Sequence, residues 1–196
     1  LIKNQVITKN KINFSESINF KDVNFSYGEK KVLINFNLKI KKGEKIGIIG
    51  SNGKGKSTLL NIFLGFLKPN SGIILVDDND IHQDVFAWRE NIGYVPQNIN
   101  LMNMSIKDNI LFGREESKQI DSKLLNISCL TKFIESYNEG INTEVSELGK
   151  NISGGQAQKI AIARSLYLNP KILILDESTS SIDNEDEKEI IENLIR

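Results

Sequence analysis

A glycine-rich stretch at residues 50–58 constrains this chain more than any other feature of its sequence. Its residues fit the pattern G-x-x-x-x-G-K-[ST]. A short apolar run at residues 45–49 precedes the stretch and helical spacing from about residue 56 to 67 follows it, which predicts a buried strand, a loop and a helix. Backbone N–H groups in such a loop converge on phosphate oxygens at the start of the helix. The sequence therefore predicts a phosphate-binding loop.

The residue types in this loop suit a nucleoside triphosphate and its metal ion. We expect Lys56 to reach the β- and γ-phosphates and Ser57 to ligate Mg²⁺. The alternative is a glycine-rich turn with an incidental lysine. The predicted nucleotide-binding residues of the loop are Ser51, Asn52, Gly53, Lys54, Gly55, Lys56, Ser57 and Thr58.

An acidic pair follows a second apolar run near the end of the sequence. Residues 171–176 close on Asp176, and Glu177 comes next. Because ligands bind at the carboxyl ends of parallel strands, we expect Asp176 to hold Mg²⁺, directly or through water. We expect Glu177 to polarise the attacking water. The alternative is a strand that ends in acidic residues for solubility, and the phosphate-binding loop earlier in the chain favours the functional interpretation.

The remaining apolar patterns predict further strands on either side of the loop. Residues 18–25 and 32–40 alternate in polarity as two half-exposed strands do, and we expect them to pair in an antiparallel way. Residues 73–76 and 92–95 predict two more short strands. Together with the alternating helices, these strands predict an α/β fold: a P-loop NTPase core with a mostly parallel sheet, joined to an N-terminal antiparallel β subdomain.

A helical insertion is predicted between about residues 98 and 168, where no strand pattern occurs. Helical spacing is found at residues 105–111, 117–127 and 153–168, and again at residues 186–195 after the acidic pair. The fold class therefore includes a helical insertion subdomain.

Size, charge and composition limit the classes of function. The chain has 196 residues, with 39% hydrophobic and 26% charged residues, and fits one globular domain. Twenty-five basic residues balance twenty-five acidic ones, so no overall positive field favours nucleic acid or anionic lipid. No apolar run is long enough to span a membrane. The single cysteine, Cys129, excludes an internal disulfide and a cysteine-based zinc site, and we interpret it as a buried apolar residue rather than a nucleophile.

A second glycine-rich stretch opens the predicted helix at residues 153–168. Ser153 is a good N-cap residue, and the glycines after it leave backbone N–H groups available to an anion. The alternative is a capping turn only. The stretch Ile152, Ser153, Gly154, Gly155 and Gln156 resembles the Leu-Ser-Gly-Gly-Gln signature of the nucleotide-binding domain of ATP-binding cassette (ABC) transporters, and matches it at four of five positions.

The resemblance covers about residues 18–196 and implies roles for further residues. It assigns Tyr27 to stacking on adenine and Val32 to nucleotide binding. It assigns Gln97 to sensing Mg²⁺ and to contact with the membrane domain, and residues 181–183 to a loop that crosses a dimer interface. The signature residues Ser153, Gly154, Gly155 and Gln156 complete the predicted nucleotide-binding set. The predicted catalytic residues are Glu177, Lys56 and Gln97. The predicted metal-binding residues are Ser57, Gln97 and Asp176.

Other segments favour an exporter within this family. Residues 143–149 resemble the exporter-type segment that touches the transmembrane partner, and residues 109–113 are also common in exporters. Trp88 and Arg89 loosely resemble lipid-linked oligosaccharide flippases, and Trp88 is interpreted as a core residue in preference to a lining of the groove for a transmembrane helix. His82 is interpreted as a surface residue.

Three departures from the family pattern bear on activity. Ile152 replaces leucine, which should cost little. Lys54 stands where the family usually has a small residue, and we expect its long side chain either to affect packing at the dimer interface or to add positive charge near phosphate. The family's catalytic histidine comes later than the last residue, so we expect weak or no turnover from this piece.

The resemblance implies an ATPase domain that uses ATP and Mg²⁺ and works as one of two head-to-tail subunits, in a homodimer or heterodimer. We expect residues 1–15 to be a linker from a preceding transmembrane region, and residues 16–196 to be the domain itself, at the cytoplasmic face of the inner membrane. Nucleic acid is not an expected partner. The alternatives are a non-transport ABC ATPase of DNA repair, chromosomes or translation, and an inactive regulatory nucleotide-binding module.

Overall fold

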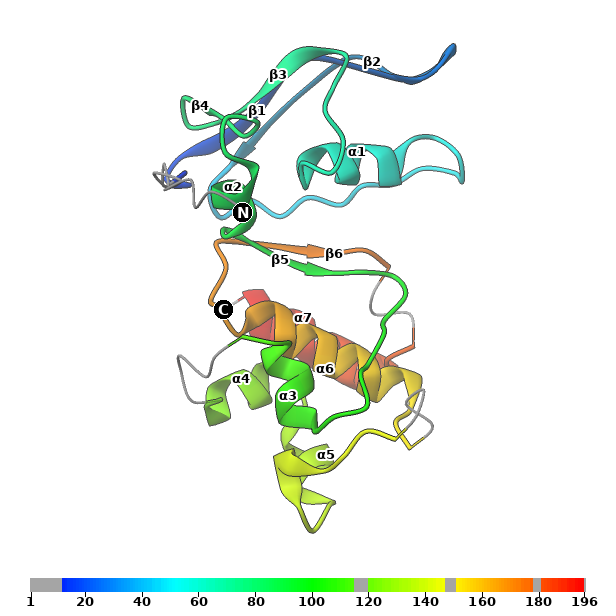
Figure 1. Ribbon diagram of the computed structural model, residues 1–196, viewed down its shortest axis with the longest axis vertical. Coiled ribbons are helices and arrows are strands. Elements are labelled where there is room, and N and C mark those ends of the chain that lie inside the picture. The colour runs from blue at the N-terminus through cyan, green and yellow to red at the C-terminus, as the bar shows by residue number, and fades with distance from the viewer. Residues whose placement is uncertain (1–11, 115–119, 147–150, 178–180, 196) are drawn as a thin grey trace, which may run out of the picture. The chain divides into compact units, whose positions relative to one another are not determined.

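The computed structural model describes residues 12–114, 120–146, 151–177 and 181–195 (Figure 1). The chain divides into two compact units, Leu1–Asn91 and Ile92–Arg196, and each is described by itself. The first unit holds the phosphate-binding loop. The second holds the signature and the acidic pair.

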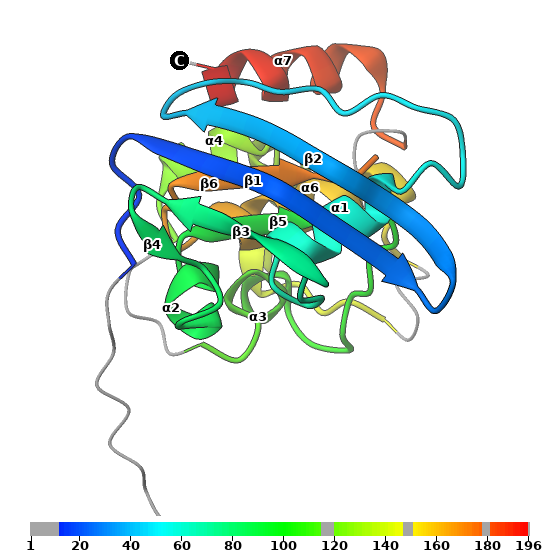
Figure 2. The same ribbon diagram turned by 90° about the horizontal axis from the view of Figure 1, so that it is seen from above.

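The first unit is built on an antiparallel sheet. Its strands are β1 (Ser17–Tyr27), β2 (Lys30–Lys41), β3 (Ser71–Val76) and β4 (Asn79–Asp80), in the spatial order β2-β1-β3-β4 (Figure 2). The predicted antiparallel pair at residues 18–25 and 32–40 is confirmed, as is the strand at residues 73–76. The sheet therefore forms the N-terminal β part of a mixed α/β fold.

Alternation in β1 makes one face of this sheet apolar. Ile18 and Phe20 are buried, and the register with β2 shifts before Val23, which is also fully buried. Phe20 packs on Phe63 at the end of helix α1, with ring centroids 5.7 Å apart. The burial of these rings fixes α1 against the sheet, because apolar area removed from water is the main stabilising term.

Two helices complete the first unit. Helix α1 (Lys56–Phe63) is shorter than the predicted 56–67, because the N–H groups of Phe66 and Leu67 both turn back to the carbonyl of Asn61. Helix α2 (Val85–Arg89) is capped by Asp84. Trp88 on α2 is 0% exposed and its Nε1 donates to the carbonyl of Phe63 at 2.6 Å. The interpretation of Trp88 as a core residue is therefore confirmed.

Two segments of this unit, residues 45–49 and residues 12–14, differ from the sequence predictions. The predicted strand at residues 45–49 is wrong: the segment forms no strand, and Ile49 is 97% exposed. A buried strand needs neighbours that accept its hydrogen bonds, and none of β1 to β4 pairs with it. Ile12 and Phe14 are buried, so the folded part begins inside the segment 1–15 predicted as a linker, of which residues 1–11 lie outside the described residues.

The second unit contains a parallel pair of strands. These are β5 (Ile92–Val95) and β6 (Ile172–Leu175), paired in register from Ile92 with Ile172 to Val95 with Leu175. Both predicted strands are confirmed. A mostly parallel sheet is not: among the described residues this pair is the only parallel ladder, and the larger sheet is antiparallel.

Two helices pack against this pair (Figure 1). Helix α6 (Gly154–Leu166) carries the signature at its start, and helix α7 (Asn184–Ile195) follows the acidic pair. Their shared core consists of Val95, Ala161, Ile162, Ile182 and Ile190. The predicted helices at residues 153–168 and 186–195 are confirmed.

Short helices fill the stretch between β5 and α6. They are α3 (Ile106–Leu111), α4 (Ser122–Ile127), α5 (Thr131–Glu135) and the 3-10 helix η1 (Gly140–Asn142). Helix α3 matches the prediction for residues 105–111. Helix α4 is shorter than the predicted 117–127, because the carboxylate of Asp121 caps it by accepting from the N–H of Leu124, and residues 115–119 lie outside the described residues.

In the described parts of the chain, no helix combines the length and apolar character needed to cross a membrane.

Candidate nucleotide-binding site

The phosphate-binding loop leads directly into helix α1. The Nζ of Lys56, at the first position of α1, donates to the loop carbonyls of Gly50 at 2.6 Å and Ser51 at 3.5 Å. Ser57 is exposed and Thr58 is buried in the first turn. The lysine ammonium therefore lies over its own loop, and the neighbouring serine hydroxyl faces solvent.

Gly55 explains why the loop can approach β2 so closely. Its φ is +90°, and a Cβ at this position would lie 2.7 Å from Cγ1 of Val32. An L residue would meet both a strained backbone and a steric clash there. Val32, which the family resemblance assigned to nucleotide binding, thus lies directly against the loop.

The predicted adenine-stacking residue lies at the end of β1. Tyr27 is 50% exposed, and its ring meets that of Phe25 edge to face with centroids 4.9 Å apart. Phe25 is buried, so it anchors one edge of the Tyr27 ring while half of that side chain remains accessible. This accessibility is what a stacking platform requires.

Lys54 departs from the family pattern without disturbing the loop. Its backbone N–H donates to the carbonyl of Ser51 at 3.3 Å, and its side chain is exposed. The Lys54 side chain takes no part in this backbone turn, so the turn does not depend on the type of residue at this position. Its exposed ammonium adds a positive charge close in sequence to Lys56.

In the second unit, the parallel pairing of β5 and β6 brings two predicted site residues together. The Nε2 of Gln97, two residues after β5, donates to Oε2 of Glu177, two residues after β6, at 2.6 Å. Both side chains are exposed, and Glu177 has a left-handed backbone with φ of 48°. Strands in register end at the same edge, which is why residues 80 positions apart in sequence meet here.

Tyr94 is a site residue that sequence reasoning missed. Its hydroxyl donates to Oδ2 of Asp176 at 3.1 Å, and burial, together with this carboxylate, raises the pKa of Tyr94. This hydrogen bond fixes one of the two carboxylate oxygens of Asp176. The contact could have been predicted only from the parallel register, because Tyr94 pairs with Ile174 of β6, two residues before Asp176.

The donor atoms predicted for Mg²⁺ are of the kind this ion prefers. They are a serine hydroxyl at Ser57, a carboxylate at Asp176 and an amide at Gln97. Because Gln97 donates its Nε2 to Glu177, its amide oxygen is the atom left for a ligand. Mg²⁺ binds hard oxygen ligands, so the donor set fits this ion in its chemistry.

The signature residues form the start of helix α6 in the second unit. Ser153 caps the helix, with its Oγ accepting from the N–H of Gln156 at 3.2 Å, while Oε1 of Gln156 accepts from the N–H of Ser153 at 2.8 Å. This capping box occupies the Gln156 side chain, which was predicted to bind nucleotide. Ser153 and Gly154 are exposed at the helix end.

The interface loop predicted at residues 181–183 lies against the signature. A Cβ on Gly155 would lie 2.8 Å from the carbonyl oxygen of Ser181, so only glycine fits that approach. The N–H of Ser181 also donates to Oε1 of the buried Gln158 at 3.1 Å. The structure therefore joins these two predicted interface elements.

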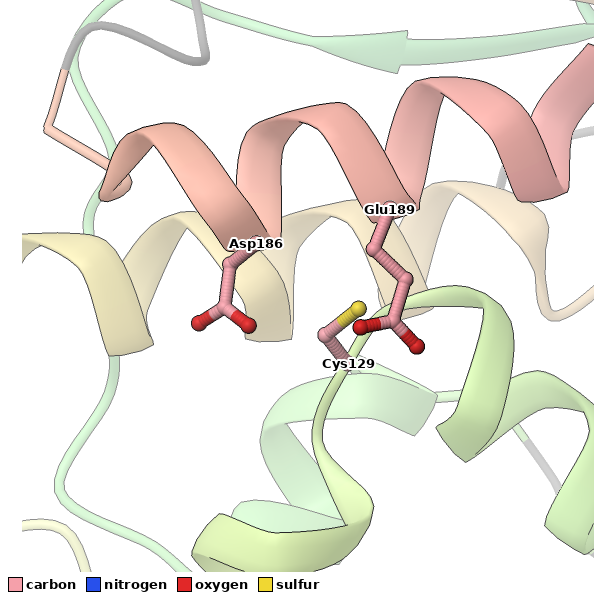
Figure 3. Close-up of side chains that lie close together, drawn as sticks. All are labelled: Cys129, Asp186 and Glu189. Carbon is pink, nitrogen blue, oxygen red and sulfur yellow. The ribbon is translucent and has the colours of Figure 1, made fainter.

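The single cysteine lies in a small polar cluster on the second unit. Figure 3 shows Cys129 beside Asp186 and Glu189 of α7, with ligand atoms within 4.8 Å of one another. Asp186 already forms an ion pair with Lys159. Burial, and then the two carboxylates, raise the pKa of the Cys129 thiol to about 11. The thiol is therefore protonated at neutral pH and unsuited to nucleophilic attack, as the sequence predicts, although the residue is half-buried beside carboxylates and not fully buried among apolar groups.

His82 is less exposed than the sequence indicated. Among the described residues its buried Nε2 finds no hydrogen-bond partner, and burial lowers the pKa of the ring. The interpretation as a surface residue is only partly right, because the side chain is half-buried and its Nε2 is enclosed. Its neutral form is the one that this environment favours.

Comparison with known proteins places this site in a family. The ABC transporter family pattern matches residues 33–180. An ATP-dependent lipid A-core flippase of Desulfotalea psychrophila is 42% identical over 190 residues, which cover 93% of this chain and 33% of the flippase. The ATP-binding cassette sub-family B member 5 of Mus musculus is 45% identical over 177 residues, which cover 87% of this chain and 14% of that protein.

A solved structure agrees with this assignment. A bacterial Atm1-family ABC exporter with ATP bound has a TM-score of 0.85 and 33% identity, and the match covers 93% of this chain and 33% of that one. The chain thus spans about a third or less of the length of the relatives it matches. It belongs to the ABC transporter family.

Proposed function

We propose that this chain binds ATP with Mg²⁺ and hydrolyses it to power an exporter or flippase at the cytoplasmic face of the inner membrane. The observation that carries the proposal is the pairing of Gln97 with Glu177 where two parallel strands end, in a chain that also has a complete phosphate-binding loop. Both features belong to one chemistry, because phosphoryl transfer needs a phosphate cradle and a positioned water.

Lys56 binds phosphate in this proposal by changing partners. Its ammonium bonds to the neutral carbonyls of Gly50 and Ser51, and phosphate oxygens replace them when nucleotide arrives. A charge-assisted bond to phosphate is stronger than one to a neutral carbonyl. The loop N–H groups and the start of α1 add partial positive charge.

Glu177 orients and polarises the attacking water. Its Oε2 accepts from Gln97, which leaves Oε1 to accept a hydrogen bond from the water. Gln97 fixes the direction in which the carboxylate points. Mg²⁺ held by Ser57, Gln97 and Asp176 would supply charge neutralisation at the phosphate oxygens.

Two copies of the domain act together in this proposal. The exposed helix start at Ser153 and Gly154 is directed to the nucleotide of a second ATPase domain, identical or different, so that ATP lies between them. Residues 143–149, of which 147–149 lie outside the described residues, and the region of Gln97 contact transmembrane domains. Closure around ATP pulls on these domains, and hydrolysis releases them.

An arginine at the signature serine should separate dimerisation from nucleotide binding. We expect Ser153→Arg to abolish ATP-dependent association, because a long cation blocks the exposed helix start, while the affinity of one chain for ATP stays near wild type. The measurement is sedimentation velocity with and without MgATP in a Glu177→Gln background that keeps ATP intact. Ser153→Thr, which retains the cap, is the control. A Ser153→Arg protein that still dimerises with ATP would contradict the role of the signature.

Loss of the Tyr27 ring should weaken nucleotide binding moderately. Tyr27→Ala removes the half-exposed platform at the end of β1, and stacking on a base contributes about 1–3 kcal/mol. The dissociation constant for MgATP, measured by isothermal titration calorimetry, should rise accordingly. Tyr27→Phe keeps the ring and should bind as the wild type does. Equal affinity of Tyr27→Ala and the wild type would exclude stacking at this position.

The transport role is favoured over the non-transport alternatives. The segment between β5 and α6 contains short, separate helices in its described parts, whereas chromosome-associated relatives carry a long coiled coil there. Relatives that match this chain include a flippase and an exporter. An intact Glu177 also disfavours an inactive regulatory module.

A further inference from the structure

We propose that Arg164 and Asn109 are positioning residues that hold the loop after Gln97, and thereby hold the contact between Gln97 and Glu177. The sequence pattern singled out neither side chain, although Asn109 begins the segment 109–113 that is common in exporters. The kinetic part of this proposal rests on the proposed ATPase function, and the structural part does not.

Asn109 organises the loop from inside helix α3. It is 0% exposed, and its Oδ1 accepts from the N–H of Met102 at 2.9 Å. Its Nδ2 donates to the carbonyls of Met102, Met104 and Ser105 at 2.9, 3.2 and 3.1 Å. One buried amide thus bonds to four backbone groups of this segment, in addition to the backbone hydrogen bonds that its carbonyls accept.

Arg164 ties the same loop to helix α6. Its Nε donates to the carbonyl of Asn109 at 2.7 Å, and its two terminal nitrogens donate to Oδ1 of Asn109 at 3.3 Å and to the carbonyl of Asn100 at 3.5 Å. The guanidinium also lies over the Phe112 ring, 4.4 Å from its centroid. The planar fork of arginine makes all these contacts at once, which a lysine ammonium does not.

These contacts fix the loop at both sides of Gln97. Val95, two residues before it, belongs to β5, and Asn100, three residues after it, is held by Arg164. Gln97 itself is exposed, and its side chain bonds to Glu177. Helix α6, which provides Arg164, is anchored in the core of the second unit by the fully buried Ile160, Ile162 and Ala163. The position of α6 therefore sets the reach of Gln97 toward the carboxylate.

The structural part is tested by NMR on Arg164→Lys. We expect the side-chain amide signal of Gln97 to move away from its wild-type position, and amide exchange at Met102 to become faster. Phe112→Ala, which removes the ring beneath Arg164 at a 48% exposed site, is a second variant and should move the Gln97 signal in the same direction. A Gln97 signal unchanged in both variants would overturn the proposal.

Arg89→Lys is the matched control for this experiment. Arg89 also donates to two backbone carbonyls, those of Leu64 and Gly65, and lies over the ring of Phe66, 4.3 Å from its centroid. All of these residues belong to the first unit. The control should leave the Gln97 signal unchanged. A shift of equal size in the control would show a general loss of packing and would also overturn the proposal.

The kinetic part is tested by a double-mutant cycle on ATP hydrolysis. Arg164→Lys should lower kcat on the order of tenfold with KM for MgATP unchanged, because the Gln97 and Glu177 geometry loosens while the phosphate loop stays intact. In a Gln97→Ala background the same change should have no further effect. Additive effects would refute positioning through Gln97. A wild-type protein that does not bind MgATP would contradict the proposed function, and the NMR result would still decide the structural part.

Discussion

Replacing Glu177 with glutamine should leave MgATP binding intact and lower the rate of hydrolysis by about 10²–10³-fold. Glutamine has the same shape as glutamate, but its amide neither carries the charge that polarises water nor accepts a proton. The side chain is exposed and pairs with Gln97 across the sheet edge, so the substitution removes no core contact. The fold should therefore be unaffected and the loss confined to the chemical step.

Phosphate release at saturating MgATP measures this prediction, with binding measured separately on the same samples. Glu135→Gln, an equivalent change at an exposed glutamate at the end of α5, is the control and should keep the wild-type rate. A Glu177→Gln protein that hydrolyses ATP as fast as the control would show that another group activates the water. The role assigned to the acidic pair would then be wrong.

The elements of this fold that sequence predicts well are those set by local pattern. Strand β1 follows from apolar residues at every second or third position and β2 from stricter alternation, and the start of α6 follows from Ser153 and the residues after it. The helix after the phosphate loop also follows from its motif. In each case the information lies within a few neighbouring residues, because capping and polarity alternation are local effects.

The features that sequence did not predict depend on partners distant in the chain. Residues 45–49 have the composition of a buried strand but no strand partner in their own unit, so composition alone misled the prediction. The bond from Tyr94 to Asp176 depends on the register between β5 and β6. The contacts of Arg164 with Asn109 cross 55 positions, and no local pattern announces them.

Removal of the loop lysine should have the second large effect. Lys56→Ala is expected to weaken MgATP binding by about 2–3 kcal/mol, because a charge-assisted bond to phosphate is lost without replacement. This loss of binding free energy raises the dissociation constant for MgATP by about 30- to 150-fold. Lys56 bonds to the carbonyls of Gly50 and Ser51, so part of the loop's own order depends on the same ammonium.

Lys45→Ala is the matched control for this variant. Lys45 is an exposed lysine just before the loop, and its replacement makes the same change in net charge. It should bind MgATP as the wild type does. Thermal unfolding without nucleotide should be similar for Lys45→Ala and Lys56→Ala, which would exclude loss of fold as the cause of weak binding.

Isothermal titration calorimetry of MgATP into the wild type, Lys45→Ala and Lys56→Ala tests the central claim most directly. If the loop at residues 50–58 binds the phosphates, the wild type and Lys45→Ala give equal affinities and Lys56→Ala binds at least about 30-fold more weakly. Equal affinity in all three proteins, or no binding by the wild type, would contradict the assignment of this chain as an ATP-binding domain.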